Sequence, residues 1–93
     1  MDKIIFQNQT TVGFSEEFVT NGITTIAASG TFDGAILKLQ IKQTGLGFDW
    51  TYTGDTLNES HLSDYLLGTR RANFRFELID AGASTDLTVM VGG

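Results

Sequence analysis

The chain has 93 residues with no cysteine and no proline, and its 11 acidic residues outnumber its 6 basic ones, which gives a net charge of -5. A chain of this length has apolar surface for one core, so we expect a single domain covering residues 1–93. The missing cysteines exclude a disulfide framework and thiol catalysis, and the acidic balance argues against nucleic acid, whose phosphates attract Lys and Arg.

A short apolar run at residues 4–6 follows Lys3 and ends at the polar Gln7. Such a run is far too short for the apolar segment of a signal peptide or for a membrane span. We therefore expect no targeting segment and no membrane among the partners.

Weak strand signals mark the first third of the chain. Ile4, Phe6, Val12 and Phe14 are spaced as in short strands, where every second side chain lies on the same face. The Asn-Gly pair at residues 21–22 is typical of a tight turn, but a hairpin around it would have no cleanly apolar face. We expect edge strands that contain bulges.

The clearest pattern lies between residues 26 and 52, where three alternating segments are separated by turn residues. The pair Asp33-Gly34 is typical of a two-residue hairpin turn and predicts direct pairing of the segments on either side. That register gathers apolar residues on one face. The opposing pairs are Phe32 with Ala35, Gly30 with Leu37, Ala28 with Leu39, and Ile26 with Ile41.

A second hairpin is predicted across the loop at residues 43–46. Its register places three aromatic residues on the same apolar face, namely Phe48, Trp50 and Tyr52. Trp50 could instead stack on a sugar, as exposed aromatic rings do in carbohydrate-binding domains. The shared apolar face favours core packing for all three rings.

The strand pattern lapses between residues 53 and 73. Leu62, Tyr65 and Leu66 recur at helical spacing, which indicates one short helix near residues 59–67. An irregular crossover is the alternative.

Alternation resumes near the carboxyl end, first in residues 74–78 and again in residues 87–91. A four-residue loop at residues 81–84 predicts a hairpin in which Phe76 faces Val89 and Leu78 faces Leu87. This second apolar surface can close over the first. The predicted fold class is all-β, a small antiparallel β-sandwich of about seven or eight strands.

Catalytic and metal sites are weakly supported. His61 is the only histidine, so a nucleophilic triad would depend on it, and a surface role is the simpler interpretation. Four aspartates could ligate Ca²⁺, but they lack the spacing of a calcium loop: Asp33, Asp49, Asp55 and Asp64. We expect no enzymatic activity, no cofactor and no metal.

A small acidic sandwich without catalytic residues is expected to act by contacting a partner. Arg70 and Arg71 form the only basic doublet, and they follow the apolar residues around Tyr65. An Arg beside exposed aromatic groups is a common interface anchor. Ile5 and Phe6 complete the candidate contacts, because the predicted core register does not need them.

Two stretches, GTFDGAILKLQIKQTGLGFDW and FRFELIDAGASTDLTVMV, carry a resemblance that runs from Gly30 to Val91. The first leads from a Gly-Ala hairpin strand through a glycine turn to a tryptophan, and the second contains an Ala-Gly-Ala-Ser-Thr turn before the last strand. Both are similar to small β-sandwich virion proteins of tailed bacteriophages, which include capsid decoration and accessory proteins. Residues 53–73 are longer and more helix-like than the corresponding part of that group.

The resemblance implies a non-enzymatic virion structural protein, most simply a capsid decoration or accessory protein that binds the major capsid protein or another virion protein. It also implies self-association, with a trimer as the expected form, and a place in the phage particle after synthesis in the bacterial cytoplasm. It carries over no site residue. The alternative is a tail-associated carbohydrate- or receptor-binding module, which requires Trp50, Tyr52 or Tyr65 to be exposed.

Overall fold

The structure is a computed structural model, and it describes residues 2–20, 22–66 and 72–92. The described residues form nine strands and one turn of 3-10 helix, η1. Their bounds are β1 (Asp2–Gln9), β2 (Gly13–Phe14), β3 (Phe18–Thr20), β4 (Ile23–Thr31), β5 (Ile36–Gln43), η1 (Thr44–Leu46), β6 (Phe48–Leu57), β7 (His61–Leu66), β8 (Ala72–Ile79) and β9 (Asp86–Gly92).

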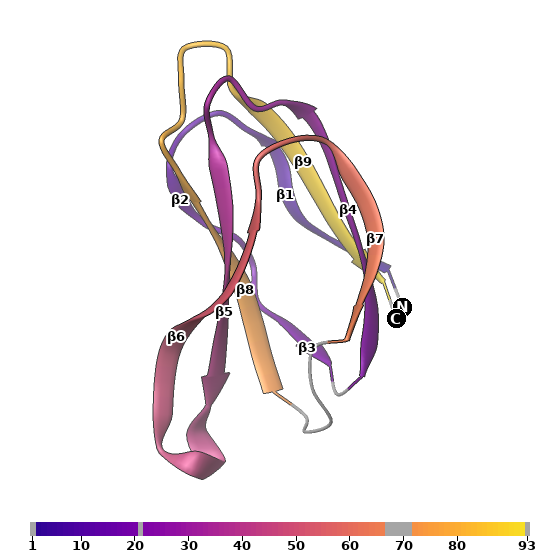
Figure 1. Cartoon of the computed structure of the whole chain (residues 1–93), viewed down its shortest axis with the longest axis vertical. Coiled ribbons are helices and arrows are strands. Elements are labelled where there is room, and N and C mark those ends of the chain that lie inside the picture. The colour runs from indigo at the N-terminus through magenta and orange to yellow at the C-terminus, as the bar shows by residue number, and fades with distance from the viewer. Residues whose placement is uncertain (1, 21, 67–71, 93) are drawn as a thin grey trace.

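The strands form two antiparallel sheets that pack together as a sandwich, which confirms the predicted fold class. The first sheet has the order β1-β9-β4-β7, and the second has the order β2-β8-β5-β6 with β3 also paired to β8 (Figure 1). If β2 and β3 are counted as one interrupted strand, this is the strand order of a jelly roll, the double-sheet arrangement of eight strands.

The core lies between the sheets and is filled by alternate residues of the central strands, because every second side chain of a strand points to the same face. On β8 the alternation is complete, with Phe74, Phe76 and Leu78 at most 2% exposed. The other fully buried large side chains come from β4, β5 and β9, and they are Ile26, Leu37, Leu39, Leu87 and Val89.

The predicted turn at Asp33-Gly34 is confirmed, but the predicted pairing of the two strands on either side of it is wrong. The amide of Ala35 donates to the Phe32 carbonyl at 2.9 Å, so the chain does reverse there. The two strands then enter opposite sheets: β4 pairs with β7 and β9, whereas β5 pairs with β6 and β8. Ile26 and Leu39 are both buried, as predicted, but neither belongs to a β4–β5 pair.

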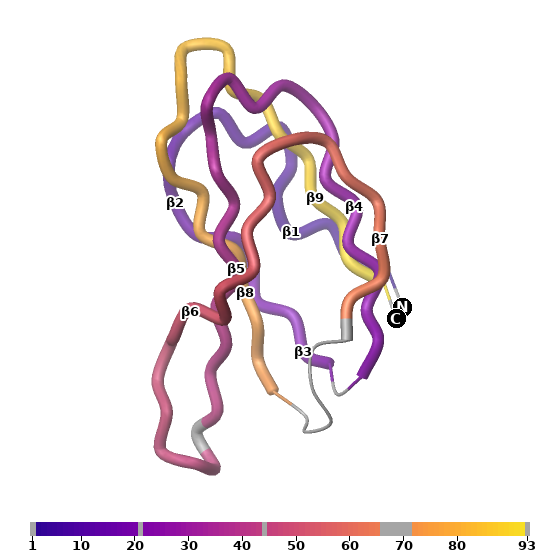
Figure 2. Tube along the Cα trace, viewed as in Figure 1, coloured from indigo at the N-terminus to yellow at the C-terminus, as the bar shows by residue number. Residues whose placement is uncertain are grey.

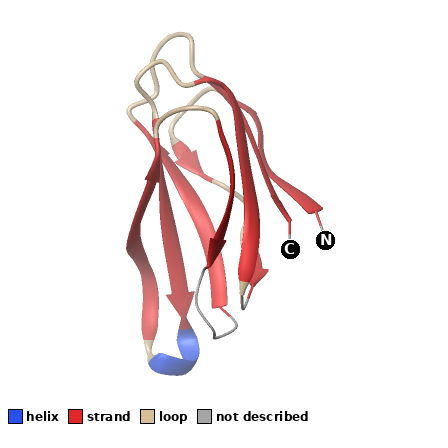
Figure 3. Ribbon diagram, turned by 45° about the vertical axis from the view of Figure 1, so that its right-hand side comes forward, coloured by secondary structure: helices blue, strands red, loops and turns tan. Residues whose placement is uncertain are grey.

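The predicted pairing of the last two strands is wrong for the same reason. β8 and β9 belong to different sheets, so Phe76 and Val89 meet in the core without forming a ladder. Figure 3 shows these sheet-to-sheet connections as loops at one end of the molecule. A sandwich core and a one-sheet hairpin bury the same faces, and side-chain alternation does not distinguish them.

Hydrogen bonds join the two loops that cross between sheets at this end. The Thr85 hydroxyl donates to the Phe32 carbonyl at 2.7 Å and accepts from the Gly82 amide at 2.9 Å. The Ser84 amide donates to the Asp33 carboxylate at 2.9 Å. The loops therefore hold each other, and with them the two sheets.

β5 and β6 do pair, but in a different register from the predicted one. Gln43 lies opposite Phe48, Ile41 opposite Thr51 and Gln40 opposite Tyr52, with two register shifts along the pair. A one-residue slip moves every side chain to the other face. Trp50 and Tyr52 therefore lie on the outer face, whereas Phe48, opposite Gln43 at the end of the hairpin, is 60% exposed without a change of face. The prediction that these three aromatic residues belong to the core is wrong. Figure 2 shows this hairpin extending beyond the rest of the sandwich.

The helix expected near residues 59–67 is replaced, over its described part, by strand β7. β7 pairs with β4 from Ile23 opposite Leu66 to Ala28 opposite His61. Leu62 is 73% exposed on the outer face, while Tyr65 packs against the core. Residues three apart lie on one face of a helix but on opposite faces of a strand. The prediction of a helix assumed that both side chains are buried, and Leu62 is not.

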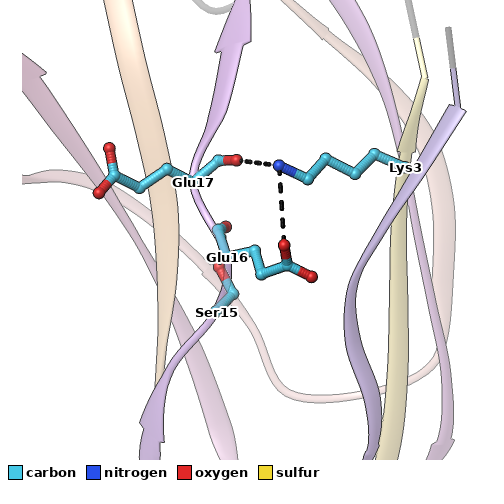
Figure 4. Close-up of polar contacts among 4 residues, drawn as sticks. All are labelled: Lys3, Ser15, Glu16 and Glu17. Atoms are coloured by element: carbon cyan, nitrogen blue, oxygen red, sulfur yellow. Dashed lines mark hydrogen bonds and ion pairs between the residues drawn. The ribbon is translucent and has the colours of Figure 1, made fainter.

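The bulged edge strand predicted near the amino end is confirmed. β1 is an edge strand, and its pairing with β9 has two register shifts. Lys3 of β1 reaches the segment between β2 and β3, where its Nζ donates to the Glu17 carbonyl at 2.6 Å and lies 4.0 Å from the Glu16 carboxylate (Figure 4). This contact joins the two sheets at their shared edge.

Candidate functional site

The proposed contact residues of β1 are not accessible. Ile5 is 3% exposed and Phe6 is 4% exposed, and both belong to the core cluster. The register shift between Ile4 and Phe6 is a bulge, which turns two successive side chains to the same face. The premise that the core does not need Ile5 and Phe6 is therefore wrong.

The other proposed contacts lie on or after β7. Tyr65 packs partly against the core, and its ring centroid lies 6.0 Å from that of His61. Burial, followed by the nearby Asp55 carboxylate, raises the pKa of Tyr65 above the ordinary value of 10.0. Arg70 and Arg71 lie outside the described residues.

The outer face of the second sheet carries a cluster of aromatic and basic side chains. Its centre is Arg75 of β8, whose guanidinium carbon lies 3.8 Å from the ring centroid of Phe14 and 4.2 Å from that of Trp50. The Arg75 Nε also donates to the side-chain oxygen of Gln40 at 2.7 Å. Cation–π contacts and a hydrogen bond thus fix the guanidinium between two rings.

Adjacent side chains continue this cluster along β5 and β6. The Tyr52 hydroxyl donates to the Glu77 carboxylate, and the Lys38 Nζ lies 4.6 Å from the Tyr52 ring centroid. The hydrogen bond to Glu77, followed by burial and the negative charge of Glu77, raises the pKa of Tyr52 above 10.0. Lys42 lies 5.9 Å from the Trp50 ring centroid. We refer to these eight residues as the outer-face cluster: Phe14, Lys38, Gln40, Lys42, Trp50, Tyr52, Arg75 and Glu77.

Sheet pairing explains why these residues meet. Gln40 lies opposite Arg75 on β8 and opposite Tyr52 on β6, so the three side chains form a row across the outer face. Directly opposed residues of antiparallel strands are close enough for their side chains to interact. Phe14 reaches Arg75 from β2, which pairs with β8 on its other side.

The cluster is ordered and accessible at the same time. Gln40 is only 6% exposed although it lies on an outer face, because its neighbours cover it. Phe14 and Tyr52 at the rim are 52% and 50% exposed. A partner can therefore reach a packed layer of rings and cations.

The cations of this cluster lack carboxylate partners. Within the described part of the chain, the one ion pair within 4.0 Å joins Lys3 and Glu16. Lys38, Lys42 and Arg75 are three of the 6 basic residues of a chain with a net charge of -5, and they share one sheet face. Among the cluster residues, three cations stand against one carboxylate, Glu77, which accepts a hydrogen bond from Tyr52, so the cluster carries a net positive charge on an acidic protein.

The sequence contained one signal for this cluster that the predicted register did not use. Gly54 interrupts the strand pattern of β6, and an isolated glycine in a strand often marks a bulge. It adopts a φ of +96°, and the β5–β6 pairing shifts between Gln40 and Lys38, opposite this part of β6. A bulge at Gly54 marks the β5–β6 pairing as irregular, but the face of Trp50 is set at the other register shift, between the Ile41–Thr51 and Gln43–Phe48 pairs.

Two of the aspartates considered as calcium ligands accept hydrogen bonds from within the protein. Asp33 accepts from a backbone amide in the loop contact described above, and Asp64 accepts from the Thr25 hydroxyl at 2.6 Å. Over residues 2–20, 22–66 and 72–92, no three His, Asp or Glu side chains are grouped to hold a metal ion. No helix in the same residues is long and apolar enough to cross a membrane.

Comparison of the chain with protein-family models, with curated proteins and with solved structures found no match. The comparisons assign no family and no activity. The functional argument therefore depends on the geometry of the outer-face cluster.

Proposed function

We propose that this protein is a non-enzymatic docking domain that binds a protein partner through the outer-face cluster. Following the sequence resemblance, we further propose that it is an accessory component of a phage particle and that the partner is the major capsid protein. The observation that carries the docking function is the Arg75 guanidinium held between the rings of Phe14 and Trp50.

The composition of the cluster supports a protein partner. Residues that dominate the binding energy of protein interfaces are enriched in Trp, Tyr and Arg, and this cluster contains all three types. Side chains that are already ordered lose less entropy on binding. Arg75 is ordered by the two rings and by its hydrogen bond to Gln40, so its surface is prepared for an interface.

The alternative function, a carbohydrate-binding module, requires exposed aromatic rings, and the structure meets this requirement only in part. Tyr52 and Phe48 are 50% and 60% exposed, as that function requires. However, stacking on a sugar needs a free ring face. Trp50 turns a ring face to Arg75, and Tyr52 turns one to Lys38. Each of these rings thus has a cation on one of its two faces, and Lys42 also lies near Trp50, which favours a protein partner over a sugar.

The charge of the cluster indicates an acidic partner surface. Lys38, Lys42 and Arg75 have no carboxylate within 4.0 Å in the described residues, so carboxylates of a partner can complete their pairing. Complementary charge accelerates association and excludes other partners. The affinity is therefore expected to fall as salt concentration rises.

The strand order adds support by analogy alone. Jelly rolls occur in viral capsid proteins and in lectins, so the fold is compatible with both the capsid-binding function and the glycan-binding alternative. Because one fold hosts many functions, the choice between the two depends on the site.

Co-sedimentation with phage capsids tests this function. The wild-type protein is expected to bind saturably, and Arg75→Ala is expected to weaken binding by about tenfold or more, which corresponds to the loss of an interface hot spot. Gln7→Glu is the matched control, because it makes the same change of net charge at an exposed position of β1, in the other sheet. Equal binding of Arg75→Ala and wild type would show that the cluster is not the docking surface. Binding to glycans in place of capsids would support the alternative.

A further inference from the structure

The sandwich has four sheet edges, and an edge strand exposes backbone amides and carbonyls that can pair with another strand. Natural proteins interrupt such edges with bulges, short strands, lysines or prolines. Three of the four edges described here are interrupted. β1 and β6 each have two register shifts, and the edge beside β8 consists of the short strands β2 and β3.

The fourth edge, β7, has none of these interruptions. Its six residues from His61 to Leu66 pair with β4 without a register shift, and they include no lysine and no proline. No described strand pairs with its other side (Figure 1). Leu62, in the middle of this edge, is 73% exposed.

We infer that β7 pairs antiparallel with β7 of a second copy of this chain, about a two-fold axis through Ser63. This pairing joins the two β1-β9-β4-β7 sheets into one eight-stranded sheet. The inference does not rest on the proposed docking function.

The sequence of β7 selects this register. Opposed residues of antiparallel strands lie on the same face, so Leu62 and Asp64, which face outward, must oppose each other or themselves. An axis at Asp64 would place two carboxylates directly opposite each other, which is destabilising. An axis at Leu62 would pair only residues 61–63 of β7 with the second copy, whereas the axis at Ser63 pairs residues 61–65 and places each Leu62 opposite an Asp64.

The inner face fits the same register. Each His61 then lies opposite a Tyr65 of the second copy, so a His–Tyr ring contact like the one within each chain can form between the chains. Leu62 loses part of its exposed apolar surface. Every opposed pair of unlike residues occurs twice, as in any interface with two-fold symmetry.

The dimer has a consequence for docking. A two-fold axis perpendicular to the joined sheet leaves both outer-face clusters on the same side of the dimer. Two linked sites that reach neighbouring partners bind more tightly than one site alone. A repetitive partner surface would therefore be bound by both copies.

Light scattering over a range of protein concentrations tests the inference. The expected mass is twice the chain mass of 10.1 kDa, falling to the monomer on dilution. Leu62→Asp places a carboxylate opposite Asp64 of the second copy, whereas Leu62→Lys places an ammonium group there. The dimer dissociation constant is expected to be about tenfold higher for Leu62→Asp than for Leu62→Lys.

Leu46→Asp is the control, because Leu46 is 53% exposed in η1, away from β7. It is expected to leave the dimer unchanged, and Trp50→Ala is expected to do the same. A monomer at every concentration would overturn the inference, as would the trimer that the sequence resemblance implies or equal dissociation constants for the two Leu62 variants. Dissociation by Trp50→Ala alone would place self-association at the outer-face cluster and overturn the pairing through β7, whereas loss of capsid binding with the dimer intact would bear on the docking function alone.

Discussion

At the residue scale, backbone geometry requires glycine at position 30, although the sequence pattern of the strand alone does not show this requirement. Its φ is +117°, and an added Cβ would lie 2.1 Å from the Asp86 carbonyl oxygen. Both the dihedral angle and the clash with backbone exclude a side chain there. The sequence showed only a glycine near a turn, because the close neighbour belongs to β9, far along the chain.

Gly30→Ala is expected to lower the free energy of unfolding by at least about 1–3 kcal/mol, the cost of one strained backbone conformation, because the clash adds to that strain. Gly45→Ala is the control, since nothing lies within 4 Å of its added Cβ. Denaturant unfolding of both variants measures the difference. Equal stability of the two variants would contradict the described approach of Gly30 to Asp86.

The pKa of Tyr52 supplies a second prediction at this scale. Its hydrogen bond to Glu77 raises the pKa above 10.0, so the folded protein holds this proton more tightly than the unfolded chain does. The resulting stabilisation is fully present below pH 10 and is lost as the pH rises through the folded pKa. Glu77→Ala is expected to move the pKa of Tyr52 down towards 10.

Tyrosinate absorbance during an alkaline titration measures this shift. The chain has two tyrosines, so both proteins should carry Tyr65→Phe to leave Tyr52 as the only signal. Coincident titration curves with and without Glu77 would argue against the Tyr52–Glu77 hydrogen bond.

At the scale of elements, the sequence predicted which side of each strand is buried better than which strands pair. Ile26, Leu39, Phe76 and Val89 are all in the core as expected. The partners differ because a tight turn can either fold a strand back in one sheet or carry the chain into the facing sheet, and alternation is the same in both. Contacts between the two crossing loops, distant in sequence, accompany the second arrangement.

Thr85→Val tests that contact. Thr85 is 2% exposed, and its hydroxyl bonds both the Phe32 carbonyl and the Gly82 amide. Valine keeps the shape but leaves two polar groups without their partner, so we expect a loss of about 1–3 kcal/mol in the free energy of unfolding. Thr56→Val, at an exposed position, should change stability little. An unchanged midpoint for Thr85→Val in thermal unfolding would show that the loops do not hold each other through this hydroxyl.

At the scale of the whole molecule, the alternation of apolar side chains was sufficient to predict a small β-sandwich, whereas the candidate site depended on strand register, which alternation does not determine. Lys38 and Gln40 alternate with the buried Leu37 and Leu39, and together with Lys42 they lie on the outer face. Trp50 and Tyr52 join them only because the irregular β5–β6 register turns them outward. The sequence analysis assigned Trp50 and Tyr52 to the core, and for that reason it did not find the outer-face cluster.

The unfolding free energy of Trp50→Ala, measured beside that of Phe76→Ala, tests most directly the claim that Trp50 belongs to an outer surface and not to the core, which the docking function requires. Phe76 is 2% exposed, and its truncation should cost about 3–5 kcal/mol. For Trp50 we expect a loss of about 1 kcal/mol, the scale of its cation–π contact with Arg75, with the fold retained. A loss as large as that of Phe76→Ala would place Trp50 in the core and contradict the account of the outer-face cluster.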